Sequence, residues 1–320
     1  MNSLPAILQF EPILSKRVWG GTRLHTVLGK AAEPDIGESW ELSGVEGHIS
    51  KLIGEDLDLN QLIDQWGPDL LGQKVWKHYG TKFPLLFKFI DAAQDLSVQV
   101  HPDDSYAQKH HESFGKTEMW YVMHADPGAR LIMGFKEGVV QSDYLTALEA
   151  GTLAGLLKEV PVSAGDAFYI APGTVHAIGG GILLAEIQQT SDLTYRMFDW
   201  NRMGLDGKPR QLHTAHALQV MNFEPIDAGL LGEAQSENEF VLKESPYFHT
   251  SLIQVDGKIS RDHSRLDSFV VYMCVEGTAN LIVGAESCSL EMGQTVLVPA
   301  KEKGVILEGK DSSILAVYVP

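Results

Sequence analysis

Cysteine and basic residues are both scarce in this 320-residue sequence. Its two cysteines, Cys274 and Cys288, are too few for a disulfide framework and favour a reducing cytoplasm. Lysine and arginine number 25 against 42 acidic residues, a formal net charge of −17, which argues against a nucleic-acid binder or a polybasic membrane protein. No stretch approaches the roughly 20 apolar residues of a membrane span. Residues 1–10 lack the basic segment and apolar run of a secretory signal. These absences predict a soluble, acidic, cytoplasmic protein without nucleic-acid or membrane partners.

Short strand-like runs make up most of what is present. They often alternate apolar and polar residues, and Gly, Pro or Asp clusters bound them. In the first half they cover residues 83–90, 96–101, 119–123, 130–133, 167–171 and 182–187, and the pattern continues after residue 245. Helical patterning is confined to residues 59–79, 106–113, 144–157 and 212–221. Many short strands with few helices predict a mainly β protein made of antiparallel sandwiches or barrels.

Two stretches of the first half recur in the second half. Residues 119–134 align with 269–284, 150 positions later, and residues 164–178 align with 292–306, 128 positions later. Each unit reads as a strand, a glycine turn, a strand and a Gly-x-x-strand-Pro segment. Two matches in the same order indicate an internal repeat, which predicts two related β barrels.

The second copy lacks the polar residues of the first. Glu118 aligns with Ser268, and His176 aligns with Gly304. We therefore expect the chemistry in the first copy and a scaffold or lid in the second. The predicted division is a catalytic domain that carries the helices and a second domain, joined by an acidic linker at 227–239: residues 1–235 and 236–320.

Several polar side chains are predicted to face one pocket. Alternate residues of a strand share a face, so Ser97, Gln99 and His101 point the same way, as do Lys116 and Glu118. Lys88 lies within the apolar run FPLLFKFI, where a lysine costs several kcal/mol unless it has a partner or a wet cavity. A barrel interior that opens into a polar pocket explains all of them.

A metal ion fits such a pocket. Two histidines and a carboxylate form a set typical of catalytic zinc sites, and His101, Glu118 and His176 come from three separate strands or turns. Gln99, two residues before His101, is a fourth candidate ligand. Each residue taken alone is also compatible with an ordinary hydrogen-bonded polar position. The string Gly-Asp-x-x-x-Ile-x-Pro-Gly-x-x-His that ends at His176 favours the metal.

That string, residues 165–176, resembles the second signature of the cupin β barrels, with its proline one place later than usual. Further segments resemble the type I mannose-6-phosphate isomerases in their short bacterial form. The resemblance extends from RVWGG and GESWELSG near the start through the second barrel, so it covers nearly the whole chain. It is carried above all by four segments: 87–104, 115–123, 172–181 and 186–202.

The resemblance implies two cupin-like jelly rolls, the second without metal, and one zinc ion per chain. It implies that zinc is held by Gln99, His101, Glu118 and His176. It also implies that Arg196 is the active-site arginine, in a pocket shared with Lys88, Lys116, Glu186 and Asp192.

Two features depart from the longer relatives. Those proteins have a histidine where this chain has Gly115, and they carry a large helical insertion before the zinc histidine. Only about 58 residues separate Glu118 from His176 here. A catalytic base assigned to the absent histidine therefore cannot be transferred to this chain.

The reaction implied is the interconversion of an aldose phosphate and a ketose phosphate through a cis-enediolate. Zinc as a Lewis acid, with Lys116 and Arg196, would stabilise the developing oxyanion. The general base is left open among Glu186, Asp192, a lysine of lowered pKa and zinc-bound water.

The expected partner is a small sugar phosphate, and the chain is expected to be a monomer or a small homo-oligomer. Its phosphate needs local cations, for which Arg196, Arg202 and Lys88 are candidates, and Ser97 is a further substrate-binding candidate. Arg202 is equally compatible with a salt bridge to Asp199 or Asp206. His213 and His216, three apart on a predicted helix, are interpreted as ordinary polar helix positions.

Two other classes stay open. One is a cupin oxygenase or decarboxylase that uses iron or manganese, although such sites favour more histidines than the two found here. The other is a sugar-phosphate-binding module without catalysis, for which a metal and two pocket lysines would be excessive.

Overall fold

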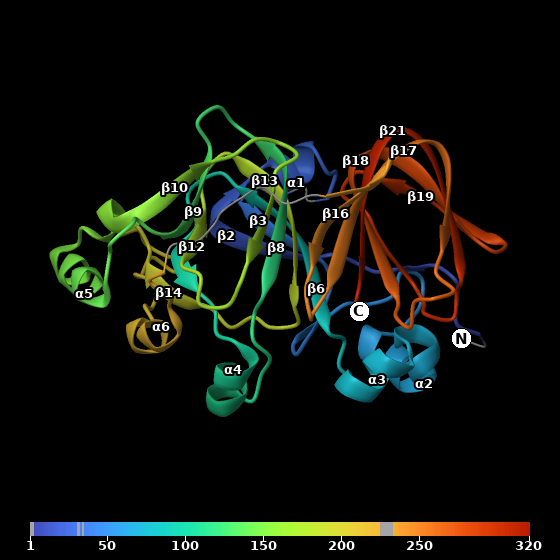
Figure 1. Cartoon of the computed structure of the whole chain (residues 1–320), viewed down its shortest axis with the longest axis horizontal. Helices are drawn as coiled ribbons and strands as arrows, with labels where there is room; N and C mark the ends of the chain where they lie inside the picture. The colour runs from blue at the N-terminus through green and yellow to red at the C-terminus, as the bar shows by residue number, and fades with distance from the viewer. Residues whose placement is uncertain (1–2, 31–32, 34, 225–232) are drawn as a thin grey trace.

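The computed structural model describes residues 3–30, 33, 35–224 and 233–320. The chain forms two β-sheet halves that lie side by side, with the helices around their ends (Figure 1). Among the described residues, no helix is long and apolar enough to cross a bilayer. The prediction of a mainly β protein is confirmed.

The first half contains two large sheets. The six-stranded sheet has the order β11 (Ala167–Ile170), β8 (Glu118–Ala125), β13 (Ile182–Gln189), β6 (Leu85–Ala92), β2 (Ile13–Gly21) and β3 (Ile36–Leu42). The five-stranded sheet has the order β10 (Leu157–Pro161), β9 (Arg130–Phe135), β12 (His176–Ile178), β7 (Val98–Val100) and β14 (Tyr195–Phe198). A short pair, β4 (Gly44–Val45) and β5 (His48–Ile49), stands apart. Every residue of β6 and β13 is buried, so these strands form the centre of their sheet.

The second half is one eight-stranded sheet. Its order is β1 (Leu8–Gln9), β20 (Thr295–Val298), β18 (Val270–Val283), β21 (Gly304–Tyr318), β17 (His249–Asp262), β16 (Glu239–Glu244) and β15 (Glu233–Ser236), with β19 (Glu286–Glu291) paired to β18. The strand β1 is contributed by the start of the chain and pairs with β20 through Leu8 and Leu297. Residues 227–232 of the predicted linker lie outside the described residues, and the remainder begins the β15–β16 hairpin.

The predicted repeat has a counterpart in the strand pairing. In the first half β8 pairs with β11, and the chain then enters the other sheet as β9, which pairs with β12. In the second half the long strand β18 pairs with β20 through its first residues and with β21 along most of its length. Closed barrels are not confirmed, because none of the sheets in the described residues closes on itself.

In the part of the chain that the structure describes, six helices flank the sheets: α1 (Arg23–Thr26), α2 (Leu59–Leu71), α3 (Gln73–Tyr79), α4 (Asp104–His111), α5 (Gln141–Ala150) and α6 (Thr214–Val220). The predicted helix at 144–157 is wrong at its end. Gly151, with φ of 68°, terminates α5, since a left-handed residue stops the helical ladder. A short 3₁₀ turn follows, and Leu157 already belongs to β10.

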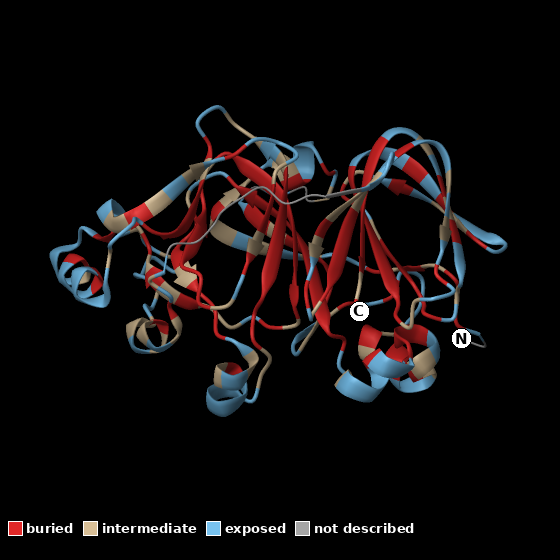
Figure 2. Ribbon diagram, viewed as in Figure 1, coloured by how far each residue is buried: buried red, intermediate tan, exposed pale blue. Residues whose placement is uncertain are grey.

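One continuous core joins the two halves. The rings of Phe83 and Phe269 lie 4.8 Å apart, one from each half. Buried residues fill the strands of both halves, whereas the helices are exposed on their outer faces (Figure 2). The halves therefore share apolar burial, which is the main source of folding free energy.

The α2–α3 corner ties the first half to the second. Gly72 adopts a φ of 94°, and a Cβ there would lie 2.2 Å from the carbonyl oxygen of Asp267. The Asp267 carboxylate accepts hydrogen bonds from the backbone N–H groups of Gln73, at 2.7 Å, and Lys74, at 3.1 Å. A residue of the second half thus satisfies the free donors at the start of α3.

We expect Asp267→Ala to lower the free energy of unfolding by about 1 kcal/mol, as for other lost helix caps. Chemical denaturation measures this change. The exposed strand residue Asp256 offers a control, Asp256→Ala, which should change stability by less than about 0.5 kcal/mol. An Asp267→Ala protein as stable as the wild type would contradict the cap.

Candidate metal centre and active-site cavity

A cavity of about 760 Å³ lies within the first half. Residues from both large sheets and from the N-terminal strands β2 and β3 line it. Seven of the predicted site residues are among them: Lys88, Ser97, Gln99, Lys116, Glu186, Asp192 and Arg196. The strands β6, β7, β13 and β14 therefore bring together side chains that are up to 108 positions apart in the chain.

Three buried side chains form a metal-capable group beside this cavity. The ligand atoms of His101, Glu118 and His176 all lie within 4.8 Å of one another, and this is the one such group among the described residues. Nε2 of His101 is 3.3 Å from Oε1 of Glu118, and Nε2 of His176 is 3.7 Å from Oε2. The predicted cluster is thus assembled in space, at the ends of β7, β8 and β12.

The hydrogen bonding of both histidines suits a metal. Nδ1 of His101 lies 2.8 Å from the carbonyl oxygen of Leu193, and Nδ1 of His176 lies 2.9 Å from that of Thr174. A carbonyl only accepts, so each Nδ1 carries the proton and each Nε2 lone pair faces Glu118. Burial, followed by the charge of Lys116, lowers the pKa of His101 to about 3 and keeps its imidazole neutral.

The carboxylate of Glu118 also fits a metal ligand. Both of its oxygens are buried, and neither accepts a hydrogen bond of good geometry; the nearest cation is Nζ of Lys116, 2.9 Å from Oε1. Burial alone would raise the pKa of Glu118, but the positive charge of Lys116 holds this pKa well below the usual range. A buried, ionised carboxylate with free lone pairs is what a divalent cation requires.

Gln99 reaches the same cluster. It pairs with His176 across β7 and β12, and its Nε2 atom lies 3.2 Å from Nε2 of the histidine. Rotating the amide by half a turn would bring Oε1 to that position, and the two orientations are chemically close alternatives. Two imidazole nitrogens, a carboxylate and an amide oxygen form a donor set that suits zinc and neighbouring transition metals.

Lys116 is buried between the metal cluster and the cavity. Its Nζ atom is 2.9 Å from Oε1 of Glu118 and 3.4 Å from Nε2 of His101. Burial alone would lower the pKa of Lys116, but the carboxylates of Glu118 and Glu186 raise it above its ordinary value. Lys116 is therefore a charged donor at the inner wall and not a lysine of lowered pKa.

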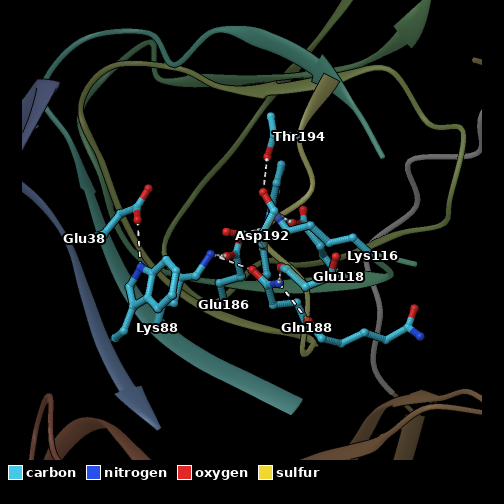
Figure 3. Close-up of polar contacts among 12 residues, drawn as sticks. Glu38, Lys88, Lys116, Glu118, Glu186, Gln188, Asp192 and Thr194 are labelled. Carbon is cyan, nitrogen blue, oxygen red and sulfur yellow. Dashed lines mark hydrogen bonds and ion pairs between the residues drawn. The ribbon is translucent and has the colours of Figure 1, made fainter. Parts of the chain in front are cut away.

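A second ion pair lies farther along the wall (Figure 3). Nζ of Lys88 is 2.7 Å from Oε1 of Glu186 and 2.6 Å from Oε1 of Gln188, and it lies 5.0 Å from the centre of the Trp40 ring. Oε2 of Glu186 accepts a hydrogen bond of 2.9 Å from Nε1 of Trp120. Burial, reinforced by the charge of Glu118, raises the pKa of Glu186. The charge of Lys88 is thus already balanced within the wall.

Arg196 has a different environment. Its Nε donates to Oγ of Ser97 at 3.4 Å, and its Nη1 donates to the carbonyl of Gln211 at 2.8 Å. Within the described residues it forms no ion pair. Burial, followed by repulsion from Arg210, lowers its pKa. Arg196 therefore presents a largely uncompensated positive charge to the cavity.

Arg17, Glu38 and Arg210 also line the cavity, and the sequence did not single them out as site residues. Arg17 binds Glu38 through two hydrogen bonds of 3.1 and 2.9 Å, and Arg210 binds Asp199. Arg17 and Glu38 lie in the RVWGG and GESWELSG segments that carried the resemblance, so a signal for them was present. Arg210 had none.

Two predicted residues are placed less centrally. Arg202 bonds Asp199 at 3.1 Å, the salt bridge weighed as its alternative, and it is not among the residues that line the cavity. Asp192 is exposed at the cavity mouth, where its backbone carbonyl accepts a hydrogen bond of 3.4 Å from Thr194. Arg202 and Arg210 share the one carboxylate of Asp199, so this trio carries net positive charge.

A mainly β fold with a His–Glu–His cluster beside a polar cavity defines a cupin-type enzyme. Residues 7–129 match the family described as "Phosphomannose isomerase type I, catalytic domain", and residues 236–319 match "Mannose-6-phosphate isomerase, cupin domain". The chain belongs to the type I mannose-6-phosphate isomerase family.

Similar proteins span the whole chain. The mannose-6-phosphate isomerase of Streptococcus mutans is 34% identical over 98% of both chains, and ManA of Bacillus subtilis is 32% identical over 97% of this chain and 98% of its own. A crystal structure of the Bacillus subtilis mannose 6-phosphate isomerase matches with a TM-score of 0.88 at 27% identity, covering 98% of this chain and 99% of that one. A mannose 6-phosphate isomerase bound with zinc and yttrium shares the fold, with a TM-score of 0.77 at 20% identity and coverage of 98% and 100%.

Proposed function

We propose that this protein interconverts mannose 6-phosphate and fructose 6-phosphate through a cis-enediol, with one zinc ion per chain. Gln99, His101, Glu118 and His176 would hold the ion. The observation that carries the proposal is the buried His–Glu–His group with free ligand atoms. It is joined through Gln99 and Lys116 to a cavity that is also lined by Arg196, which has no ion-pair partner among the described residues. Bound zinc would act as a Lewis acid for the oxygens of the reacting carbons.

The side chains at the inner wall would handle the proton. Isomerisation removes the proton on C2 of the aldose and returns one to C1, with charge developing on the oxygens. We assign hydrogen-bond donation to those oxygens to Lys116, whose Nζ faces the metal cluster. We assign proton transfer between C2 and C1 to Glu186, which is buried at the same wall. Asp192, exposed at the mouth, would contact the substrate where water still enters.

The phosphate would bind at the arginine end of the cavity. Lys88 already binds Glu186 and Gln188, so it would orient Glu186 and contact sugar hydroxyl groups. Arg196 has no carboxylate partner among the described residues and offers the planar fork that binds phosphate well. Ser97 accepts a hydrogen bond from Arg196 and still has its own O–H to donate. Arg202, with Arg210, would add positive charge through the Asp199 trio.

The proposed function is tested by following fructose 6-phosphate formed from mannose 6-phosphate by the purified protein. We expect turnover, its loss after chelation, and its return when zinc is restored. Activity indifferent to the metal would contradict the proposal. Sugar-phosphate binding without any turnover would favour a binding module, and oxygen consumption or CO₂ release with iron or manganese would favour the other cupin enzymes.

The finer architecture is also a proposal. We propose two cupin-like jelly rolls, a catalytic domain at 1–235 and a metal-free domain at 236–320. The corresponding strand pairs of the two halves and the cupin-domain match at 236–319 support this division. We further propose that the protein works in the cytoplasm, as a monomer or a small homo-oligomer, without nucleic-acid or membrane partners.

A further inference from the structure

Arg196 is held in place by a short segment that follows it in the chain. It lies on β14, the edge strand of the five-stranded sheet, which pairs with β7 on one side only. On the other side, the backbone N–H of His213 donates to the carbonyl of Arg196 at 2.8 Å. The backbone N–H of Arg196 in turn donates to Nδ1 of His213 at 3.1 Å. Together with the Gln211 carbonyl on the guanidinium, residues 211–213 bind both ends of Arg196.

The position of His213 is unusual for a helix cap. It is the N-cap of α6, yet its side chain makes no capping hydrogen bond to that helix. N-cap side chains ordinarily accept from their own helix. Nδ1 of the imidazole instead accepts a hydrogen bond from the backbone N–H of Arg196, as a carbonyl of a neighbouring strand would do if β14 were not at the edge of the sheet. His213 is thus a polar residue at the start of the helix, as the sequence predicted, but its side chain bonds β14 and not α6.

We propose that His213 is a positioning residue for Arg196, and that its imidazole does this work only in the neutral form. The proposal rests on the assignment of Arg196 to the substrate phosphate. A neutral imidazole with its proton on Nε2 accepts at Nδ1, whereas a protonated one donates from both nitrogens. Protonation of His213 would place an Nδ1–H opposite the backbone N–H of Arg196, so that two donors would face each other. It would also place a second positive charge beside the guanidinium.

The surroundings of His213 favour the neutral form. Arg196 and Tyr195 face it from β14, the tyrosine with its ring centre 6.4 Å away, and His216 faces it from α6. Burial, followed by the charges of Arg196 and His216, lowers the pKa of His213. The groups that contact His216 from α4 are Tyr106, His110 and His111.

The sign of the pH effect follows from this direction. The pKa of His213 is lower in the folded protein than in the unfolded chain, so the unfolded chain takes up the proton first as the pH falls. The neutral form therefore contributes stability above the ordinary histidine pKa of about 6.5. That contribution to stability is lost as the pH falls from about 6.5 to the lower pKa that His213 has in the folded protein. The hydrogen bond from the backbone N–H of Arg196 is lost as His213 becomes protonated.

Two substitutions separate positioning from general packing. His213→Asn places Oδ1 close to the position of Nδ1 and does not titrate, whereas His213→Ala removes the acceptor. At pH 7.5 we expect His213→Ala to raise KM for mannose 6-phosphate about tenfold, the value of one lost hydrogen bond. His213→Asn should stay within about threefold of the wild type, and zinc content should be unchanged in both.

The pH profile provides the second readout. The ratio of kcat/KM for His213→Asn to that of the wild type should rise as the pH falls from 7.5 to 5.5, because only the wild type loses the acceptor. Titration of the substrate phosphate and of the metal site cancels in this ratio. His25→Asn changes an exposed histidine of α1 and should give a flat ratio. If His213→Ala does not fold, His213→Gln replaces it. The glutamine side chain carries its amide oxygen one bond farther from the backbone than Nδ1 of histidine, so we expect KM to stay raised in this variant.

A binding measurement distinguishes the two proposals. Calorimetry with inorganic phosphate needs no turnover, and we expect weaker binding in His213→Ala that His213→Asn restores. That result in a protein without isomerase activity would support the role of His213 and contradict only the proposed function. A flat pH ratio, or equal KM and equal phosphate binding in all variants, would overturn the role of His213. A wild type that neither turns over nor binds phosphate would overturn both.

Discussion

Glu118→Gln is expected to empty the metal site and to abolish turnover. Glu118 is fully buried, and its two oxygens face the Nε2 atoms of His101 and His176. An amide keeps the shape but removes the negative charge and turns one acceptor into a donor that opposes Lys116. Zinc affinity should fall by more than about 100-fold, the upper end for loss of a residue that only supports a ligand.

Metal content and thermal unfolding measure this effect. Metal at 1,000 times its Kd stabilises a protein by about 4.1 kcal/mol, so chelation should lower the Tm of the wild type. The Tm of Glu118→Gln should be insensitive to chelation. Glu239→Gln is a matched control, because Glu239 is a partly buried carboxylate of the second half paired with Arg261. A Glu118→Gln protein that retains zinc and activity would contradict the proposed metal centre.

The second large effect is expected at Arg196. Arg196→Ala should lower kcat/KM by roughly 10²- to 10³-fold, since truncating a buried charged partner costs about 2–5 kcal/mol. The metal should remain, because Arg196 contacts Ser97 and Gln211 and none of the proposed ligand atoms. Steady-state kinetics with metal analysis of the same samples tests both statements. Arg196→Lys should recover part of the loss, as a point charge without the planar fork.

The control for Arg196→Ala is Arg265→Ala. Arg265 is exposed in the second half, so its removal changes the net charge equally without touching the cavity. Its kcat/KM should stay within about twofold of the wild type. Loss of zinc from Arg196→Ala would show that the arginine is structural, and unaltered kinetics would remove it from the phosphate site.

The sequence predicted the centre of the site because local rules decide it. Alternation along β7 placed Gln99 and His101 on one face, and the string ending at His176 marked a turn that returns to the same place. The internal repeat then directed attention to the first half, because Ser268 and Gly304 stand in the second half where Glu118 and His176, two of the proposed ligands, stand in the first. The structure brings His101, Glu118 and His176 within 4.8 Å.

The outer wall of the cavity was harder to predict. Arg17 and Glu38 lie on β2 and β3, which join the sheet only through long-range pairing with β6. No periodicity in the sequence shows which strand they will meet. His213 was missed for a different reason. Its spacing to His216 fits a helix face, whereas its function depends on the free edge of β14.

The pairing of β1 with β20 has a consequence for synthesis. Leu8 leaves the ribosome long before its partner Leu297, which lies 289 positions later in the chain. Such distant pairing delays folding, because the loop between the partners must be closed before their contacts form. The strand β1 therefore lacks its partner β20 until residues 295–298 have been made. The sheet of the second half is therefore complete only when it recruits a strand that was made before the whole of the first half.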